Sequence, residues 1–299
     1  MTSPYPKISI VIPSFNAAQT IERALRSLVA QDYPNLELLL VDGGSQDNTL
    51  QIAQSYSQYF SKIISEKDRG QPHALNKGFK LATGEIFAWL CADDELAPGA
   101  LWHVVELFQK NPEATLLTGG CTRIFSDGTI IHTAPQADLW KRISYLNGIE
   151  QPSTFWKAEI HPRAGQLDES YHFAFDCAWW NQVKISGANL ITTNRILSHY
   201  HFSDTNKTSR GGTPLVREMY RVIKQYGPLH GYLADIYFFL YRHFDLHGYY
   251  DRPPAGPKIK RWIFKNTLKL LVKIFGKELI YSYNWNFASK QERNLCWYK

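Results

Sequence analysis

Residues 86–95 read Ile86-Phe87-Ala88-Trp89-Leu90-Cys91-Ala92-Asp93-Asp94-Glu95, an apolar run followed directly by three acids. The run from Ile86 to Ala92 predicts a buried strand. Carboxylates at the end of a buried strand are costly unless a cation meets them there. A hard metal ion that carries phosphate oxygens would fit, because Mg²⁺ or Mn²⁺ is commonly held by one or two carboxylates plus substrate phosphates. The alternative is a helix start, in which Asp93 or Asp94 caps a helix that begins near Pro98.

The first hundred residues alternate between short apolar runs and segments with helical spacing of apolar residues. We expect strands at 8–12, 36–41, 63–64 and 86–92, and helices at 21–29, 50–56 and 71–81. This alternation with short connections predicts an α/β fold, a mainly parallel central sheet with helices on both faces.

Polar side chains follow each of these strands: Ser14 and Asn16, then Asp42, then Asp68, then Asp93 and Asp94. In parallel sheets, ligands bind beyond the carboxyl ends of the strands. The sequence therefore predicts that these groups meet at one edge of the sheet and form a binding site.

The pattern changes from about Leu116. Here we expect strands at 116–120, 129–132 and 190–197, an extended aromatic segment at 151–156, and a helix that begins at about Phe173 and runs to Lys184. After about Ser209 the chain has a helical pattern. The expected domains are therefore 1–209, with halves 1–100 and 101–209, and a helical region 210–299.

Composition and charge narrow the class of protein. The chain has 299 residues, a formal charge of +6 and four cysteines without a CxxC pair. The charge favours anionic or phosphorylated partners, and no nucleic-acid partner is expected. The cysteine spacing indicates neither a zinc site nor a disulfide framework, and a reduced, cytoplasmic setting fits best. No signal peptide or transmembrane run is expected.

A basic amphipathic segment occupies residues 258–281, after the proline-rich linker Pro253–Pro257. Basic residues recur at every fourth position, and apolar residues that include Trp262 fill the positions between them. Such a helix is typical of peripheral attachment to an anionic membrane surface, here the inner face of the membrane. The alternative is a helix that packs on the domain and exposes its lysines to solvent.

Four motifs in order resemble family 2 glycosyltransferases, which have the GT-A fold. They are Ile8–Asn16, Val41–Thr49, Ser65–Gln71 with Ala74–Gly78, and Thr83–Glu85 leading into Trp89–Asp94. The resemblance is strong over about the first hundred residues and weaker to about Ser209. It implies a nucleotide-sugar donor, usually a UDP-sugar, a divalent cation (Mn²⁺ or Mg²⁺) and inversion at the anomeric carbon.

The resemblance also implies roles for individual residues. Asp42 would hydrogen-bond the base, and Asp93 would face the ribose or diphosphate. Asp94 is taken as the metal ligand among Asp93, Asp94 and Glu95, and a late histidine, His201, would complete the metal site or contact the diphosphate. The residues expected to bind the nucleotide-sugar are Pro13, Ser14, Phe15, Asn16, Asp42, Asp68, Gln71 and Asp93.

Asp176 matches the residue at which the family places its catalytic base, although Phe175 stands where a second acid is more usual. An inverting transfer needs a carboxylate beside the acceptor hydroxyl to take its proton. Two alternatives stay open for single residues: Asp176 caps a helix, and His199 replaces His201.

The acceptor would be a sugar or lipid-linked hydroxyl, as in synthesis of cell-surface polysaccharide or glycolipid. A dehydrogenase is disfavoured because no GxGxxG follows the first strand, and a nucleotidyltransferase because that loop lacks a glycine-rich, basic sequence. A catalytically silent, membrane-bound scaffold is the remaining alternative.

Overall fold

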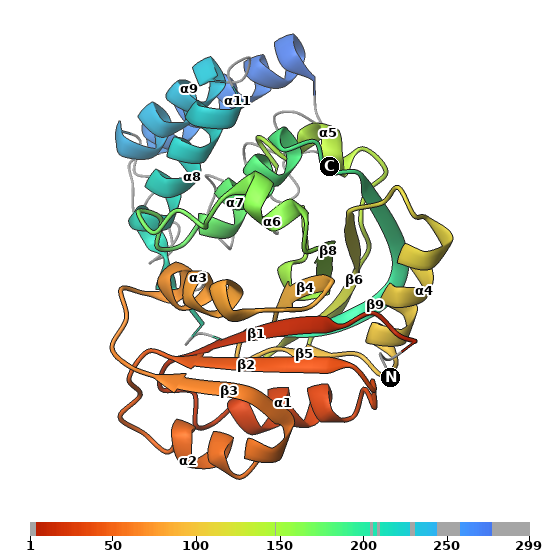
Figure 1. Ribbon diagram of the computed structural model, residues 1–299. Coiled ribbons are helices and arrows are strands. Elements are labelled where there is room, and N and C mark those ends of the chain that lie inside the picture. The colour runs from red at the N-terminus through yellow and green to blue at the C-terminus, as the bar shows by residue number, and fades with distance from the viewer. Residues whose placement is uncertain are drawn as a thin grey trace. The chain divides into compact units, whose positions relative to one another are not determined.

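Figure 1 shows the computed structural model, which describes residues 4–146, 148–203, 206–207, 210–227, 231–243 and 258–276. By internal contacts the chain divides into two compact units, Met1–Trp140 with Gly148–Asp204, and Lys141–Asn147 with Thr205–Lys299. The expected domains, 1–209 and 210–299, stay a prediction. Among the described helices, none combines the length and the apolar character needed to cross a membrane.

The first hundred residues form the parallel sheet that the sequence predicts. Its strands pair in the order β3-β2-β1-β4, all parallel: β1 (Ile8–Ser14), β2 (Leu36–Asp42), β3 (Phe60–Ser65) and β4 (Ile86–Trp89). The helices between them are α1 (Ile21–Val29), α2 (Thr49–Gln54), the short 3₁₀ turn η1 (Ser57–Tyr59) and α3 (Gln71–Leu81). In Figure 1, α1 and α2 lie on one face of these strands and α3 on the other.

The following residues extend the same sheet with mixed strand directions in the order β8-β6-β9-β5, and β7 pairs with β6. β8 is antiparallel to β4 and β6, β9 is parallel to β6, and β5 is antiparallel to β9. The strands are β5 (Glu95–Leu96), β6 (Leu116–Phe125), β7 (Ile130–Thr133), β8 (Thr154–Lys157) and β9 (Leu190–Phe202). The helices are α4 (Ala100–Lys110), α5 (Leu139–Arg142), the 3₁₀ turn η2 (Gln151–Ser153), α6 (Ile160–Ala164) and α7 (Phe175–Ile185).

Alternation of side chains along β1 explains why helices cover both faces. Ile8, Ile10 and Ile12 belong to the core cluster that also contains the buried residues of α1 and α4. Val11 points to the opposite face, where a Cβ on Gly78 of α3 would lie 2.3 Å from the Val11 Cγ1. Only glycine at position 78 therefore lets α3 pack this closely on β1.

An aromatic core joins β4, β8 and α7. Trp89, Trp156, Trp179 and Trp180 are all at most 1% exposed. The indoles of Trp89 and Trp180 stack with centroids 5.3 Å apart and an interplanar angle of 7°. These tryptophans fill the interior, and they fix α7 against the strand that leads into the acidic residues.

The expected strand at 86–92 ends three residues early, at Trp89. The Leu90 N–H still bonds to the Val11 carbonyl at 3.0 Å, and the Asp94 N–H then bonds to the Cys91 carbonyl, which closes a turn. α4 begins only at Ala100, and its N-cap is Gly99. Asp93 and Asp94 therefore lie in a loop, and the alternative that they start a helix is wrong.

The second unit is helical where it is described. α8 (Gly212–Tyr226) and α9 (Gly231–His243) pack together, with the Tyr220 and Phe238 rings stacked at 4.5 Å. The basic amphipathic segment forms α11 (Lys258–Phe275). Its expected end, 277–281, and the linker 253–257 lie outside the described residues.

Candidate active site

The acidic loop after β4 gathers three groups that can ligate one ion: the Cys91 thiol and the carboxylates of Asp93 and Asp94. One ligand atom of each lies within 4.8 Å of the other two. Within the described residues, no other group of three such side chains was found. We call this set the metal cluster.

Asp94 is buried with an incomplete set of partners. It is 1% exposed, and its carboxylate accepts a hydrogen bond from the backbone N–H of His201. The Oδ1 atom has no hydrogen-bond partner among the described residues. Burial, reinforced by the negative charge of Asp93, raises the pKa of Asp94 well above its usual range. A buried carboxylate in this state is costly unless a cation compensates it, so the residues present fit a divalent ion.

The acidic loop is also held by three side chains outside the metal cluster, those of Arg23, Glu95 and His201. The Glu95 Oε1 lies 2.5 Å from His201 Nε2 and 3.1 Å from Arg23 Nε. Arg23 also donates through Nη2 to the Asp93 carbonyl oxygen at 2.9 Å. The His201 ring is thus bonded to Glu95, and His201 is not a member of the metal cluster. Its expected role as a metal ligand stays a prediction.

β1 and β2 end side by side, with Ser14 paired to Asp42. Asp42 is fully buried and accepts five hydrogen bonds: from Ser14, Ser65 and the Ser45 hydroxyl, and from the Gly44 and Ser45 N–H groups. Burial opposes ionisation, but these donors outweigh it and lower the pKa of Asp42. In this arrangement the Asp42 carboxylate organises the loop after β2. Its expected contact with a base stays a prediction.

Asn16 ties the loops after β1 and β2 together. Its N–H donates to the Ser45 Oγ at 2.8 Å, and its Oδ1 accepts from the Gln46 N–H at 2.9 Å. Asn16 adopts a left-handed conformation with φ of 47°, which is uncommon for a residue other than glycine. Beside it, Phe15 is 63% exposed, whereas Pro13 and Ser14 are buried. An exposed phenyl ring at the strand edge offers a flat apolar surface to a ligand.

Asp68 and Gln71 connect this region to the metal cluster. Asp68 lies against the loop after β2, since a Cβ on Gly43 would be 2.7 Å from the Asp68 Oδ2. Gln71, the first residue of α3, donates through Nε2 to the Cys91 Sγ at 3.1 Å. The structure thus brings the ends of β1, β2, β3 and β4 to one edge, as the sequence predicts.

Asp176 lies in the first turn of α7 and is half-buried. Its Oδ1 accepts a hydrogen bond from the Cys177 N–H at 2.7 Å. The stacked Trp89 and Trp180 connect its helix to the strand that precedes the metal cluster. The role of Asp176 as a base stays a prediction.

The family model described as glycosyl transferase family 2 matches residues 9–184, which is more than half of the chain. The chain belongs to glycosyl transferase family 2. The matched residues include the metal cluster, Asp42 and Asp176.

Two curated relatives match part of this chain. An uncharacterised glycosyltransferase of a Nostoc species is 42% identical over 108 residues, 35% of this chain and 34% of that protein. The poly-β-1,6-N-acetyl-D-glucosamine synthase of Staphylococcus epidermidis is 32% identical over 114 residues, 38% of this chain and 28% of the synthase. Each match spans about a third or less of the relative's length.

Two solved structures share the fold. S. aureus TarS 1–349 in complex with UDP has a TM-score of 0.58 at 19% identity, over 98% of this chain and 93% of TarS 1–349. The mannosyltransferase PcManGT from Pyrobaculum calidifontis, in complex with GDP-Man and Mn²⁺, has a TM-score of 0.55 at 17% identity, over 99% and 88% of the two chains. The expected α/β GT-A fold is therefore confirmed.

Four residues of the candidate site were given no role by the sequence analysis: Arg23, Ser45, Ser65 and Cys91. Arg23 and Ser65 carry no local signal, because their partners, Glu95 and Asp42, are distant in the sequence. Cys91 and Ser45 lie within three residues of Asp94 and Asp42, so their closeness to these acids was the signal that could have found them.

Proposed function

We propose that the chain transfers a sugar from a nucleotide-sugar donor, a UDP-sugar, to a hydroxyl acceptor with inversion at the anomeric carbon. The observation that carries the proposal is the buried, incompletely partnered Asp94 beside Asp93 and Cys91, at the strand edge where a family 2 chain has its acidic motif. The UDP in TarS supports the choice of nucleotide. The S. epidermidis synthase supports a pathway of cell-surface polysaccharide or glycolipid synthesis, with a sugar or lipid-linked acceptor.

The nucleotide would lie over the ends of β1 to β3. Phe15 offers its exposed ring to the base or ribose, and Pro13, Ser14 and Asn16 form the neighbouring wall. Asp42 shapes that wall through its five hydrogen bonds. Asp68 and Gln71 form the part of the proposed pocket that lies between this wall and the acidic loop. Asp93 would face the ribose or diphosphate.

Asp94 would hold Mn²⁺ or Mg²⁺, with His201 as the further ligand implied by the family resemblance. When bound, the ion neutralises the negative charge that develops on the leaving diphosphate. The Cys91 thiol within the cluster favours Mn²⁺, because Mg²⁺ takes oxygen ligands in a rigid octahedral arrangement. The Mn²⁺ in PcManGT agrees with this choice.

Asp176 would take the proton of the acceptor hydroxyl. The acceptor oxygen then forms its bond to the anomeric carbon from one side. The bond from that carbon to the diphosphate oxygen breaks on the other side, and its electron pair leaves with the nucleoside diphosphate. A single displacement of this kind inverts the anomeric centre and requires no nucleophilic side chain.

The test begins with a panel of nucleotide-sugars in the presence of Mn²⁺. A bound donor raises the midpoint of thermal unfolding by mass action. Donors that bind are then assayed for transfer, and NMR of the product reports the anomeric configuration. A retained configuration, or stabilisation by nucleoside triphosphates but by no nucleotide-sugar, would contradict the proposal, and the second result would favour a nucleotidyltransferase.

Asp176→Asn tests the base. Transfer is expected to fall by about 10²- to 10⁴-fold, the usual contribution of general base catalysis, while UDP affinity stays nearly unchanged. Glu113→Gln, at an exposed acid in the loop before β6, is the control and should behave as wild type. Near-normal transfer by Asp176→Asn would refute the assignment.

A second proposal concerns α11, which we place on an anionic membrane surface. Among its described apolar side chains, Ile259, Trp262, Leu270 and Ile274 are 57–66% exposed, and Phe275 is 46% exposed. The first four lie within about a third of the helix circumference, and the exposed Lys269 and Lys273 lie at the edge of that arc and within it. An exposed apolar surface interspersed with lysines suits the interface of an anionic bilayer, and would locate the protein peripherally at the cytoplasmic face of the membrane.

Sedimentation with vesicles tests α11 in the full chain. Binding to anionic vesicles and not to zwitterionic ones is expected, and both Trp262→Ser and the pair Lys269→Glu and Lys273→Glu should weaken it. Equal sedimentation of all variants would contradict the membrane role. Vesicle binding by a wild-type protein that transfers no sugar from any donor would instead favour the silent scaffold.

A further inference from the structure

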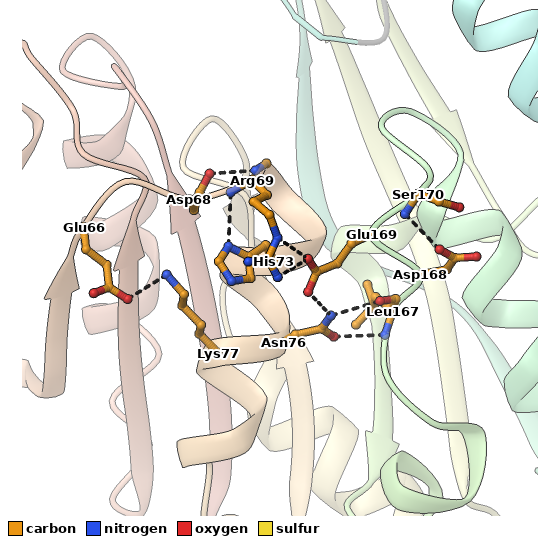
Figure 2. A network of polar contacts seen from close by, with 11 residues as sticks. Glu66, Asp68, Arg69, His73, Asn76, Lys77, Leu167, Asp168, Glu169 and Ser170 are labelled. Atoms are coloured by element: carbon orange, nitrogen blue, oxygen red, sulfur yellow. Dashed lines mark hydrogen bonds and ion pairs between the residues drawn. The ribbon is translucent and has the colours of Figure 1, made fainter.

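Two loops that belong to different halves of the glycosyltransferase fold meet beside α3. The first, Glu66–Gly70, follows β3 and contains Asp68 of the proposed donor pocket. The second, Leu167–Phe173, precedes α7 and leads directly to Asp176. Figure 2 shows how side chains of the first loop and of α3 reach the second loop.

Asn76 of α3 makes the buried part of this connection. Its Nδ2 donates to the Leu167 carbonyl oxygen at 2.9 Å, and its Oδ1 accepts from the Leu167 N–H at 2.9 Å. Asn76 is 8% exposed and Leu167 is 2% exposed. The Asn76 side chain therefore pairs with both the backbone N–H and the backbone C=O of Leu167, as a neighbouring strand would, which fixes both the position and the orientation of that loop.

Arg69 and Glu169 make the outer part. The Arg69 Nε and Nη2 atoms lie 2.9 Å and 2.6 Å from the Glu169 Oε2, and the Glu169 Oε1 accepts from the Asn76 Nδ2 at 3.3 Å. A Cβ on Gly70 would lie 3.6 Å from the ring of His172, so the loops approach each other here as well. Arg69, Asn76 and Glu169 thus form one continuous set of contacts, which we call the loop clamp (Figure 2).

The exposed ion pair is the informative part of the clamp. The Arg69 side chain is 69% exposed and that of Glu169 is 28% exposed. Pairs of this kind contribute roughly 0–1 kcal/mol to stability. Removing the charge of either partner should therefore leave the free energy of global unfolding almost unchanged. A larger effect on the rate of transfer would then come from a displaced loop and not from a less stable protein.

We propose that Arg69 and Glu169, with Asn76, are positioning residues that hold the loop before α7, and so the Asp176 carboxylate, in register with the donor pocket. This inference rests on the proposed function, because it assigns the clamp to the transfer step. Effective catalysis needs the base within hydrogen-bond reach of the acceptor hydroxyl, and a displacement of about 1 Å can cost on the order of 10²-fold.

The chain provides a matched control in the same view. Lys77, the residue after Asn76, pairs with Glu66 of the same first loop at 2.6 Å. This ion pair is also partly exposed, but it does not reach the loop before α7. Loss of Lys77–Glu66 therefore removes a comparable contact without touching the proposed connection.

The first measurement is the rate of transfer. In Arg69→Gln and in Glu169→Gln, kcat for transfer is expected to fall roughly 10- to 100-fold, while the KM for the donor stays within about twofold. The double variant should be no slower than the single variants, because both remove one connection. The exchange Arg69→Glu with Glu169→Arg should recover part of the rate. Lys77→Met and Glu66→Gln should match wild type.

The second measurement does not depend on sugar chemistry. Amide hydrogen exchange across residues 167–176 should become faster in Glu169→Gln, with the urea midpoint of global unfolding unchanged, and should stay as in wild type in Lys77→Met. Unchanged exchange there, additive losses of kcat, or an equal loss in the control would overturn the clamp. Faster exchange in a protein whose wild type transfers no sugar would overturn the proposed function and leave the structural connection standing.

Discussion

Carboxylates are buried at both ends of the parallel strands β1, β2 and β4, and two of them, Glu37 at one end and Asp94 at the other, are in opposite states. At the amino ends, Glu37 of β2 is 5% exposed, and its carboxylate accepts hydrogen bonds from Lys7, Ser9 and Thr83. At the carboxyl ends, Asp94 is buried just as deeply, but its Oδ1 has no partner among the described residues.

The pKa values follow from this difference. Burial alone would raise the pKa of Glu37, but the hydrogen bonds from Lys7, Ser9 and Thr83 outweigh it and lower the pKa to about 2. Burial and the charge of Asp93 raise that of Asp94. A fully partnered buried acid stabilises the fold, whereas an incompletely partnered one retains the capacity to bind a cation. The comparison indicates that one end of the sheet is built for stability and the other for ligand.

The largest expected effect comes from Asp94→Asn. Transfer should fall by about 10³-fold or more, because the cation would lose its buried ligand. Without metal, the variant should be at least as stable as wild type at neutral pH, since burial disfavours the charged form that the substitution removes. Activity assays and urea unfolding of the metal-free proteins measure the two effects. A variant that unfolds more easily and still transfers sugar would show that Asp94, like Glu37, serves stability and not cation binding.

Glu37→Gln should do the reverse. It should lower the free energy of unfolding by roughly 2–3 kcal/mol at neutral pH, and leave donor binding unchanged. Because the folded pKa of about 2 lies below the ordinary value of 4.5 for a glutamate, the contribution of Glu37 is present above pH 4.5 and is lost as the pH falls toward 2. The stability difference between wild type and variant should shrink over that range.

The control for this titration is Glu85→Gln. Glu85 is an exposed acid at the same end of the sheet, and its carboxylate accepts a hydrogen bond from the Lys7 N–H at 3.1 Å. It should cost well under 1 kcal/mol at any pH. A constant difference between wild type and Glu37→Gln from pH 7 to pH 3 would show that the hydrogen bonds of Glu37 do not depend on its charge.

Cys91→Ser is expected to change metal preference more than activity. Replacing the sulfur by an oxygen should narrow the preference for Mn²⁺ over Mg²⁺, by several-fold in the ratio of dissociation constants. Titration of each ion into the metal-free protein, followed by the shift in thermal midpoint, measures that ratio. An unchanged ratio would place the thiol outside the coordination of the ion.

The smallest effect concerns Asp42, an acid at the ligand end that is nevertheless fully partnered. Ser65→Ala removes one of its five donors and should cost about 1 kcal/mol of stability or less. UDP affinity should change less than twofold, because four donors still hold the loop. A large loss of UDP affinity with intact stability would mean that Ser65 itself contacts the nucleotide.

The sequence predicted the binding site at the carboxyl ends of the strands, but not the buried acid at their amino ends. Strand–helix alternation and polar residues after each strand were enough to predict the parallel sheet and the position of the acidic loop. The strand boundary at Trp89 was missed, because an apolar run does not show where the backbone leaves the sheet. The hydrogen bonds of Glu37 were not predicted. Its partners lie in other segments, so nothing near position 37 marks it as buried and bonded.

The same limit applies within the site. Asp93 and Asp94 stand out because adjacent acids after an apolar run are unusual, whereas Arg23 is an ordinary residue of an amphipathic helix. The contact between Asn76 and Leu167 joins residues 91 positions apart. Pairings across such separations arise from topology, and no local pattern of residue types encodes them.

The stacked indoles of Trp89 and Trp180 give the molecule an optical property. Together with Trp156 and Trp179 they form a group of four indoles with centroids 4.9–5.9 Å apart, whose electronic excitations couple and should contribute to the far-ultraviolet circular dichroism wherever their transition moments are not parallel. Trp89 belongs to the strand before the acidic loop and Trp180 to the helix of Asp176. The shape of that contribution would follow any rotation between the two segments during a catalytic cycle, without an added label.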